Sequence, residues 1–241
     1  MILLTVGDSF TYGDGLENPE KDTWPTLLSN SLDWDLVNLA ESGASNDTIF
    51  RKTIEFISNN LNEELFVIVG WSNPDRREER VNIKYKTNQN NQSDKNLDGR
   101  VFDRYYYDNK IFTSFIPFPT KTRNDDIVKF IYANLDDEEH SITKTVNYQI
   151  SLQYILNGLG IKYLYFNSFL PLYSHTFYPQ DILSKLKDRI RMIDHEKYVE
   201  CGSSMKTFLE LNGFDMLPDN HPDKEGHKFW AELILGVVKC Y

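Results

Sequence analysis

The sequence predicts one α/β domain, a three-layer α/β/α sandwich in which a parallel β-sheet lies between two layers of helices. Short apolar runs alternate with stretches of helical periodicity, which is the pattern of parallel strands joined by crossover helices. The 241 residues, 40% of them hydrophobic, supply enough apolar mass for one sizeable core. No obvious linker divides the chain, so residues 1–241 are expected to form a single domain.

The alternation is clearest in the first part of the chain. Residues 2–6 are a fully apolar strand candidate that ends at Gly7. Residues 23–32 carry apolar side chains at helical spacing, and Pro25 lies near the first turn, where its missing N–H costs little. Residues 36–40 are expected to form a second strand.

The next helix and strand are followed by a long irregular segment. Asn46 or Asp47 is expected to cap the helix, and residues 65–69 form the clearest buried strand, which ends at Gly70. Residues 74–124 then show no regular period. So long a stretch is usually a functional insertion, so we expect a lid or a partner surface on the main domain.

Regular patterns return in the second half of the chain. A helical region is expected over residues 125–159, with a break near 136–140. Residues 161–166 predict a further strand, and residues 223–238 a closing amphipathic helix. In a parallel sheet of this kind, functional loops lie beyond the carboxyl ends of the strands.

Composition and charge exclude several classes of function. The 26 Lys and Arg against 36 Asp and Glu give a net charge of −10, which disfavours nucleic acid or an anionic membrane as the main partner. The apolar start has no basic region or cleavage site, and no segment has the length of a membrane span. Only Cys201 and Cys240 occur, without metal or redox spacing, which fits a reducing compartment. We therefore expect a cytoplasmic protein, and its Asn, Lys, Ile and Tyr content is typical of an AT-rich genome such as a viral one.

A candidate nucleophile follows the first strand directly. The segment Gly7-Asp8-Ser9-Phe10 would place Ser9 at the carboxyl end of that strand, on a turn that Gly7 permits. The Ser9 hydroxyl and N–H would then both face the working edge of the sheet. For the tetrapeptide alone, an equally good interpretation is that Asp8 or Ser9 only caps a turn or a helix.

A candidate base lies near the other end of the chain. A hydroxyl nucleophile needs a general base, and the base needs a carboxylate to orient its ring. Asp219 and His221 supply both on a loop just before the last helix, with Pro222 next in the sequence. The alternative is a capping aspartate beside a surface histidine. His227 lies within the helix and is expected to be packed or solvated instead of acting as a second base.

These segments together resemble the ordered blocks of the SGNH, or GDSL-like, hydrolase superfamily. The similarity spans nearly the whole chain and rests on four short blocks in the expected order and strand context. The blocks are Gly7-Asp8-Ser9, Gly43-Ala44-Ser45-Asn46, Gly70 at the end of the third strand, and Asp219-Asn220-His221-Pro222.

The resemblance implies a flavodoxin-like sheet and acyl transfer to water. It makes Ser9 the nucleophile, His221 the general base and then acid, and Asp219 the carboxylate that orients His221. The N–H groups of Ser9 and Gly43 would line an oxyanion hole, the donors that meet negative charge on the tetrahedral intermediate. It implies that no metal is required.

The chain departs from the family pattern in two places. The family often places its aspartate three residues before the histidine, whereas Asp219 lies two before His221, so Asp215 is an alternative partner. The third block usually has the form Gly-x-Asn-Asp, and its asparagine is the third oxyanion donor. Here Asn73 lies one place late. Asn73 is therefore the favoured third donor. The alternatives are that the Ser72 hydroxyl replaces it or that the oxyanion hole has only two donors.

Two further side chains are candidates for substrate binding. Arg76 could pair with an anionic group of a substrate, but a solvated and self-paired surface is typical of such an Arg/Glu run. Trp71 could stack on a sugar, but inward packing explains it equally well. The sequence contains no nucleotide or metal motif, so neither a cofactor nor a metal is expected.

The sequence therefore predicts a serine hydrolase that cleaves small carboxylic esters through an acyl-enzyme. The substrate is expected to be a small molecule or a carbohydrate, for example one that carries an O-acetyl group. An acyltransferase or thioesterase of the same superfamily is an alternative, because these differ in acceptor access and not in the triad. The competing class is a binding or structural module that keeps the fold without the chemistry. The oligomeric state does not follow from the sequence.

Overall fold

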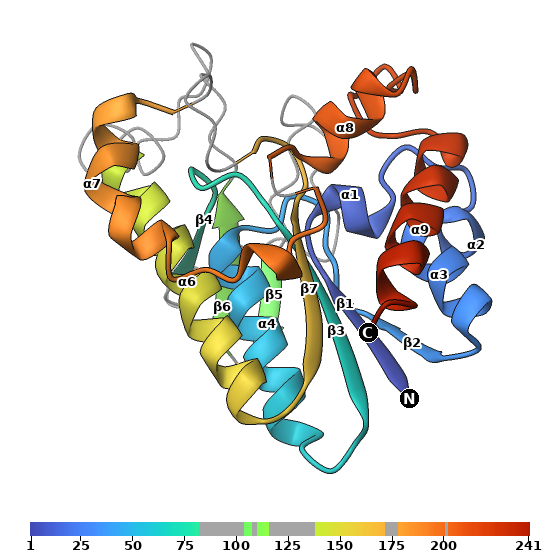
Figure 1. Cartoon of the computed structure of the whole chain (residues 1–241), viewed down its shortest axis with the longest axis horizontal. Coiled ribbons are helices and arrows are strands. Elements are labelled where there is room, and N and C mark those ends of the chain that lie inside the picture. The colour runs from blue at the N-terminus through green and yellow to red at the C-terminus, as the bar shows by residue number, and fades with distance from the viewer. Residues whose placement is uncertain (82–103, 108–109, 116–137, 172–177, 201) are drawn as a thin grey trace, which may run out of the picture.

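The computed structural model of the chain describes residues 1–81, 104–107, 110–115, 138–171, 178–200 and 202–241 (Figure 1). Residues 79–81, 104–107 and 110–115 are described by their backbone alone.

A parallel four-stranded sheet forms the centre of the molecule, as the sequence predicts. The strands are β1 (Ile2–Val6), β2 (Asp35–Asn38), β3 (Leu65–Trp71) and β7 (Lys162–Asn167), and their order across the sheet is β2-β1-β3-β7. Every neighbouring pair is parallel. β3 is buried along its whole length, because it lies inside the sheet with helices on both faces.

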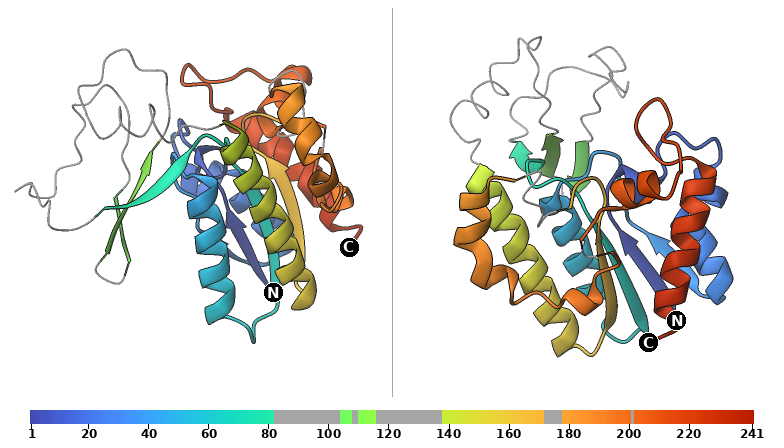
Figure 2. Two further views of the ribbon diagram at one scale, coloured as in Figure 1. Left: turned by 90° about the vertical axis from the view of Figure 1, so that its left-hand side faces the viewer. Right: turned by 45° about the horizontal axis from the view of Figure 1, so that its top comes forward.

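Helices cover both faces of this sheet, which gives the predicted three layers (Figure 2). Successive strand residues point to opposite faces, so Leu4, Val67 and Tyr165 belong to one apolar cluster and Leu3 and Phe66 to the other. The first face is covered by α4 (Asn46–Asn59), α6 (Glu138–Gly158) and α7 (Gln180–Ile190). The second is covered by α1 (Ser9–Tyr12), α3 (Trp24–Leu32), α8 (Met205–Leu211) and α9 (Lys224–Val238). The short helices α2 (Pro19–Asp22) and η2 (His195–Lys197) complete the described elements.

The predicted cap of α4 is wrong. Ser45 is the N-cap, and its Oγ accepts from the N–H of Thr48 at 3.3 Å. Ser, Asn, Asp and Thr all cap helices well, so the run from Ser45 to Thr48 offers several candidates to sequence analysis. The predicted start of α9 is confirmed, because Asp223 caps it by accepting from Gly226 N at 2.8 Å.

A second, antiparallel sheet follows β3 where no strand was predicted. It consists of β4 (Arg77–Val81), β6 (Lys110–Phe115) and β5 (Arg104–Tyr107), in the order β4-β6-β5. Much of the predicted insertion at 74–124 lies outside the described residues. The first part of the helical region predicted over 125–159, up to residue 137, lies outside them too. The role of the insertion as a lid or partner surface stays a prediction.

The carboxyl ends of β1, β3 and β7 lie at one edge of the sheet, at the top of Figure 1, where α1 begins. Gly7 permits a close approach there, since a Cβ atom at this position would lie 2.3 Å from Thr11 Oγ1. Glycine therefore lets α1 turn back tightly against the end of β1.

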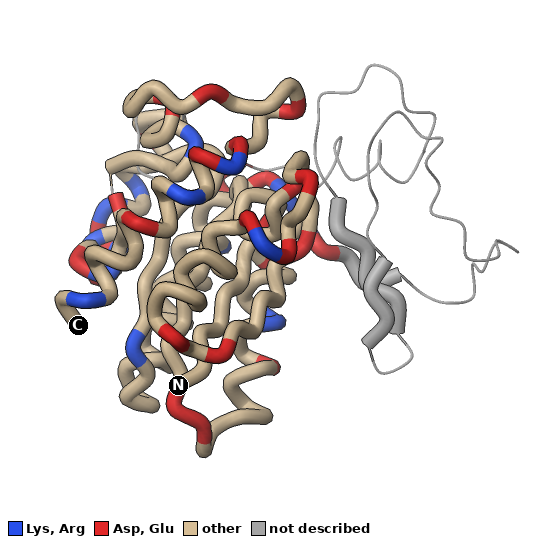
Figure 3. Tube along the Cα trace, turned by 90° about the vertical axis from the view of Figure 1, so that its right-hand side faces the viewer, with Lys and Arg blue, Asp and Glu red and all other residues tan. Residues whose placement is uncertain are grey.

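Acidic and basic positions are interspersed along the described trace (Figure 3). Among the described helices, none combines the length and the apolar composition needed to cross a membrane.

Candidate active site

Ser9 is the first residue of α1, which begins three residues after β1 ends at Val6. Asp8 caps this helix, with its Oδ1 accepting from Phe10 N at 3.1 Å. The Ser9 side chain is nearly buried, and its hydroxyl bonds to no described residue. The Ser9 N–H also donates to no described group, because the first N–H groups of a helix have no partner within it. Neither group of Ser9 is therefore used by a described residue.

His221 reaches the same edge on a tight loop that precedes α9. Leu217 N donates to His221 O at 2.8 Å, and Asn220 has a left-handed backbone with φ 65°. The imidazole packs against the ring of Phe10, with centroids 5.2 Å apart. The structure therefore brings the predicted base to the residue that follows the predicted nucleophile.

Asp219 approaches His221 at both its ring and its backbone. Asp219 Oδ2 lies 3.2 Å from His221 Nδ1, and Asp219 Oδ1 accepts from His221 N at 3.2 Å. The ring nitrogen nevertheless makes no aligned hydrogen bond with a described residue. Because Asp219 lies two residues before His221, its carboxylate lies near both the backbone N–H and the ring Nδ1 of His221. It is hydrogen-bonded to the backbone N–H and not to Nδ1. Asp215 is exposed and has no contact with His221 among the described interactions.

The final link of a proton relay is not formed in this structure. No hydrogen bond joins the Ser9 hydroxyl to His221 within the described part of the chain. Such bonds are often long or poorly aligned without substrate and become shorter when it binds. The structure thus brings His221 and Asp219 against Phe10, the residue after Ser9, without a hydrogen bond from Ser9 to His221 among the described residues.

Gly43 lies in the turn between β2 and α4. It is buried and has φ 75°, a left-handed conformation that favours glycine. Its N–H donates to no group in the described residues. Like Ser9, Gly43 therefore has a backbone N–H with no acceptor among the described residues. The predicted oxyanion role requires such an N–H.

The third block separates the two candidates for the remaining donor. Ser72 Oγ donates to Asp8 Oδ2 at 2.8 Å and accepts from Arg76 Nη1 at 2.8 Å, so this hydroxyl is committed to other groups. The Asn73 side chain makes no hydrogen bond within the described part of the chain, and its Oδ1 is buried without a partner. The geometry favours Asn73, and its role stays a prediction.

Asn46 fastens the third block to α4 instead of capping that helix. Its Oδ1 accepts from Ser72 N at 2.8 Å, and its Nδ2 donates to Ser72 O at 2.9 Å and to Thr145 Oγ1 at 3.0 Å. All its polar atoms are therefore in use. Asn46 holds the loop that carries Asn73.

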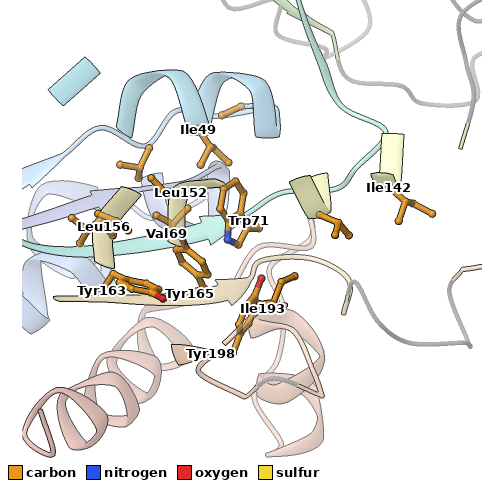
Figure 4. Close-up of a cluster of buried hydrophobic side chains, with 14 of the residues drawn as sticks. Ile49, Val69, Trp71, Ile142, Leu152, Leu156, Tyr163, Tyr165, Ile193 and Tyr198 are labelled. Carbon is orange, nitrogen blue, oxygen red and sulfur yellow. The ribbon is translucent and has the colours of Figure 1, made fainter. Parts of the chain in front are cut away.

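The structure corrects the predicted substrate-binding role of Trp71. Its side chain is 1% exposed, and its ring meets Tyr165 edge to face with centroids 5.5 Å apart (Figure 4). A ring so enclosed has no face open to a sugar. The inward-packing alternative is confirmed.

Arg76 differs from both of its predicted interpretations. It is 8% exposed, so the solvated surface is wrong for this residue. Its Nη1 lies 3.2 Å from Asp8 Oδ2, so the guanidinium turns inward to a carboxylate of the chain, and the structure does not present Arg76 to a substrate.

The sequence matches one known family over nearly its whole length. The model of the family of unknown function DUF6071 matches residues 8–239. The chain belongs to the DUF6071 family. No curated protein matches it significantly.

Solved structures resemble this DUF6071 chain across almost its full length. TesA is 14% identical, with a TM-score of 0.54, and the match covers 100% of this chain and 99% of that one. The psychrotrophic esterase EstA from Pseudoalteromonas sp. is 12% identical, with a TM-score of 0.51, and the match covers 99% of this chain and 97% of that one. A carbohydrate esterase family 2 enzyme with a carbohydrate-binding domain, from Corynascus (Myceliophthora fergusii), is 13% identical, with a TM-score of 0.52; the match covers 99% of this chain and 65% of that one. This likeness confirms the predicted fold, which the chain shares with these three proteins.

Asp14 of this DUF6071 chain is not among the predicted site residues. Its carboxylate accepts a hydrogen bond from Ser42, the residue before Gly43. Burial raises the pKa of Asp14, whereas the Ser42 hydrogen bond and the charge of His221 oppose this rise. Its place between Gly13 and Gly15, just after the Ser9 motif, was the available signal.

Across the described residues, no group of three or more His, Cys, Asp or Glu side chains is placed to hold a metal ion.

His227 is a core residue of the DUF6071 chain. It is fully buried, and its Nδ1 accepts from Trp24 N at 3.2 Å. Burial lowers the pKa of His227 to about 3, so the ring is neutral at ordinary pH. The packed interpretation of His227 is confirmed.

Proposed function

We propose that this protein is a serine esterase that cleaves small carboxylic esters. The observation that carries the proposal is the packing of His221 on Phe10, beside Ser9, with the Asp219 carboxylate 3.2 Å from the His221 ring. Nucleophile, base and carboxylate, from opposite ends of the chain, then form one constellation of the kind that acyl transfer needs.

In the proposed mechanism, Ser9 attacks the ester carbonyl while His221 takes its proton. The N–H groups of Ser9 and Gly43, with the Asn73 amide, donate to the developing oxyanion. His221 returns the proton to the leaving alcohol, which leaves an acyl group on Ser9. A water molecule then attacks the acyl-enzyme while His221 takes a proton from it, and the bond between Ser9 Oγ and the acyl group breaks as His221 returns that proton to Ser9, which releases the acid.

The proposed substrate class includes O-acetyl groups on carbohydrate. The likeness in fold to an esterase and to a carbohydrate esterase supports this choice. A thioesterase or an acyltransferase would use the same constellation. A series of esters and thioesters of graded acyl length, with acetylated glycans and alternative alcohol acceptors, separates these activities.

Ser9→Ala tests the proposal directly. We expect wild-type protein to hydrolyse p-nitrophenyl acetate and to react with a fluorophosphonate at Ser9, with the adduct located by mass spectrometry. Ser9→Ala should lose both. Ser29→Ala is the matched control, since the Ser29 hydroxyl donates to Trp34 O away from the site. Undiminished turnover by pure, folded Ser9→Ala would remove Ser9 from the mechanism.

A binding module without catalysis is the second candidate. Two observations favour it: no hydrogen bond from the Ser9 hydroxyl to a described residue, and an irregular third block. An activated serine reacts irreversibly with the fluorophosphonate, whereas an ordinary hydroxyl does not. Folded wild-type protein that takes no label would support the binding module.

A further inference from the structure

The guanidinium of Arg76 is a buried charge that meets three groups through one nitrogen. Its Nη1 lies 3.2 Å from Asp8 Oδ2, 2.8 Å from Ser72 Oγ and 3.5 Å from Ala44 O. The side chain is 10% exposed and that of Asp8 is fully buried. This is an interior ion pair with additional hydrogen bonds, a geometry in which both partners are held firmly.

The three partners of Arg76 belong to the three loops of the proposed oxyanion hole. Asp8 directly precedes Ser9, Ala44 directly follows Gly43, and Ser72 directly precedes Asn73. One side chain thus ties together the backbone on which every proposed donor is carried.

Asp8 makes the charge of Arg76 necessary. Its Oδ1 holds the N–H of Phe10 at 3.1 Å, so the carboxylate lies beside the backbone of Ser9. An unpaired negative charge there would oppose the negative charge that develops on a tetrahedral intermediate. The positive charge of Arg76 offsets the negative charge of Asp8 and so reduces this repulsion.

We propose that Arg76 is a positioning residue that acts through Asp8, Ala44 and Ser72 to hold the Ser9, Gly43 and Asn73 donors in one arrangement. The proposal rests on the proposed esterase function for its kinetic effect and on the contacts of Arg76 for its structural effect. These two parts have separate tests.

Arg77 provides a matched control, because it is the next residue and is almost equally buried, at 9% against 8% exposure. Its Nη2 donates to Ser141 Oγ at 3.3 Å, on α6, a helix that carries none of the proposed donors. We expect Arg76→Met to lower kcat for p-nitrophenyl acetate by about 10- to 100-fold, with KM within about twofold. Arg77→Met should leave kcat within about twofold.

Arg76→Lys guards against misfolding of the methionine variant. An ammonium has three donors and one charge, so it meets the same set of partners, although from a shorter stem. We expect it to recover part of the lost kcat. A folded Arg76→Met with wild-type kcat, a folded Arg76→Lys that recovers no activity, or an Arg77→Met that loses as much as Arg76→Met would overturn the kinetic part of the proposal.

Hydrogen–deuterium exchange tests positioning without any turnover. Amides of residues 7–13 and 41–46 should exchange faster in Arg76→Met than in wild type or Arg77→Met. If wild-type protein hydrolyses no ester and takes no fluorophosphonate, the proposed function fails while this comparison still decides the role of Arg76. Unchanged exchange in both segments of folded Arg76→Met would overturn it.

Discussion

The imidazole of His221 packs against the ring of Phe10, with centroids 5.2 Å apart and planes inclined by 53°. Phe10 is fully buried and also meets Phe169 edge to face at 5.6 Å. The residue after the proposed nucleophile therefore supports the proposed base, and it is itself fixed by the core.

Shortening Phe10 should impair catalysis more than an equal change elsewhere in the core. Phe10→Leu removes the aromatic surface under His221, so we expect kcat to fall by about 10-fold as the imidazole loses its support. Phe66→Leu is the control, because Phe66 is 1% exposed in the same apolar cluster but lies in β3. Both variants should unfold at a lower temperature. Equal kcat values would contradict a supporting role for Phe10.

Asp219 should be the carboxylate on which His221 depends. Asp219→Asn keeps the shape but loses the charge that stabilises the imidazolium, and we expect kcat to fall by roughly 100- to 10,000-fold. Asp215→Asn should leave kcat unchanged, since Asp215 has no described contact with His221. Steady-state kinetics of the two variants measures this difference. If kcat fell in Asp215→Asn and not in Asp219→Asn, Asp215 would be the carboxylate on which His221 depends.

Asn73 and Ser72 should differ in their effect on turnover. Asn73→Ala should lower kcat by about 100- to 1000-fold, the usual cost of one oxyanion donor. Ser72→Ala should cost less than about 10-fold, because its hydroxyl is bonded to Asp8 and Arg76 and acts only through these two contacts. The kcat of each variant with p-nitrophenyl acetate is the measurement. A larger loss in Ser72→Ala would make Ser72 the donor.

The buried His227 should make the protein less stable as the pH falls. Its pKa is lowered to about 3 by burial, whereas a histidine of the unfolded chain titrates near 6.5. Between these values the unfolded state binds a proton that the folded state does not, so the free energy of unfolding decreases by up to about 1.4 kcal/mol per pH unit below about 6.5.

Urea unfolding of wild type and His227→Gln between pH 7.5 and 5 measures this linkage. Glutamine does not titrate, and its amide oxygen is able to accept from Trp24 N in place of His227 Nδ1. Other titrating groups are common to both proteins and cancel in the comparison. The same pH dependence in both would show that His227 contributes none of it.

The order of strands and helices was predictable because the apolar pattern is local. β3 is apolar on both faces, as a central parallel strand must be, and α3 and α9 have apolar faces at helical spacing. The strands β4, β5 and β6 were missed, since no regular alternation distinguishes that part of the chain. The cap of α4 was misassigned because several adjacent side chains are equally suited to it.

Local patterns were sufficient for the central sheet with its two helical layers, for the candidate nucleophile Ser9 and for the candidate pair Asp219 and His221. The partners of Arg76 and Asn46, the burial of Trp71 and the contact between His221 and Phe10 depend on the folded arrangement. The physical reason is distance along the chain. A strand or a cap is set by neighbours within a few residues, whereas a buried charge or a ring finds its partner only after the sheet has brought separate loops to one edge.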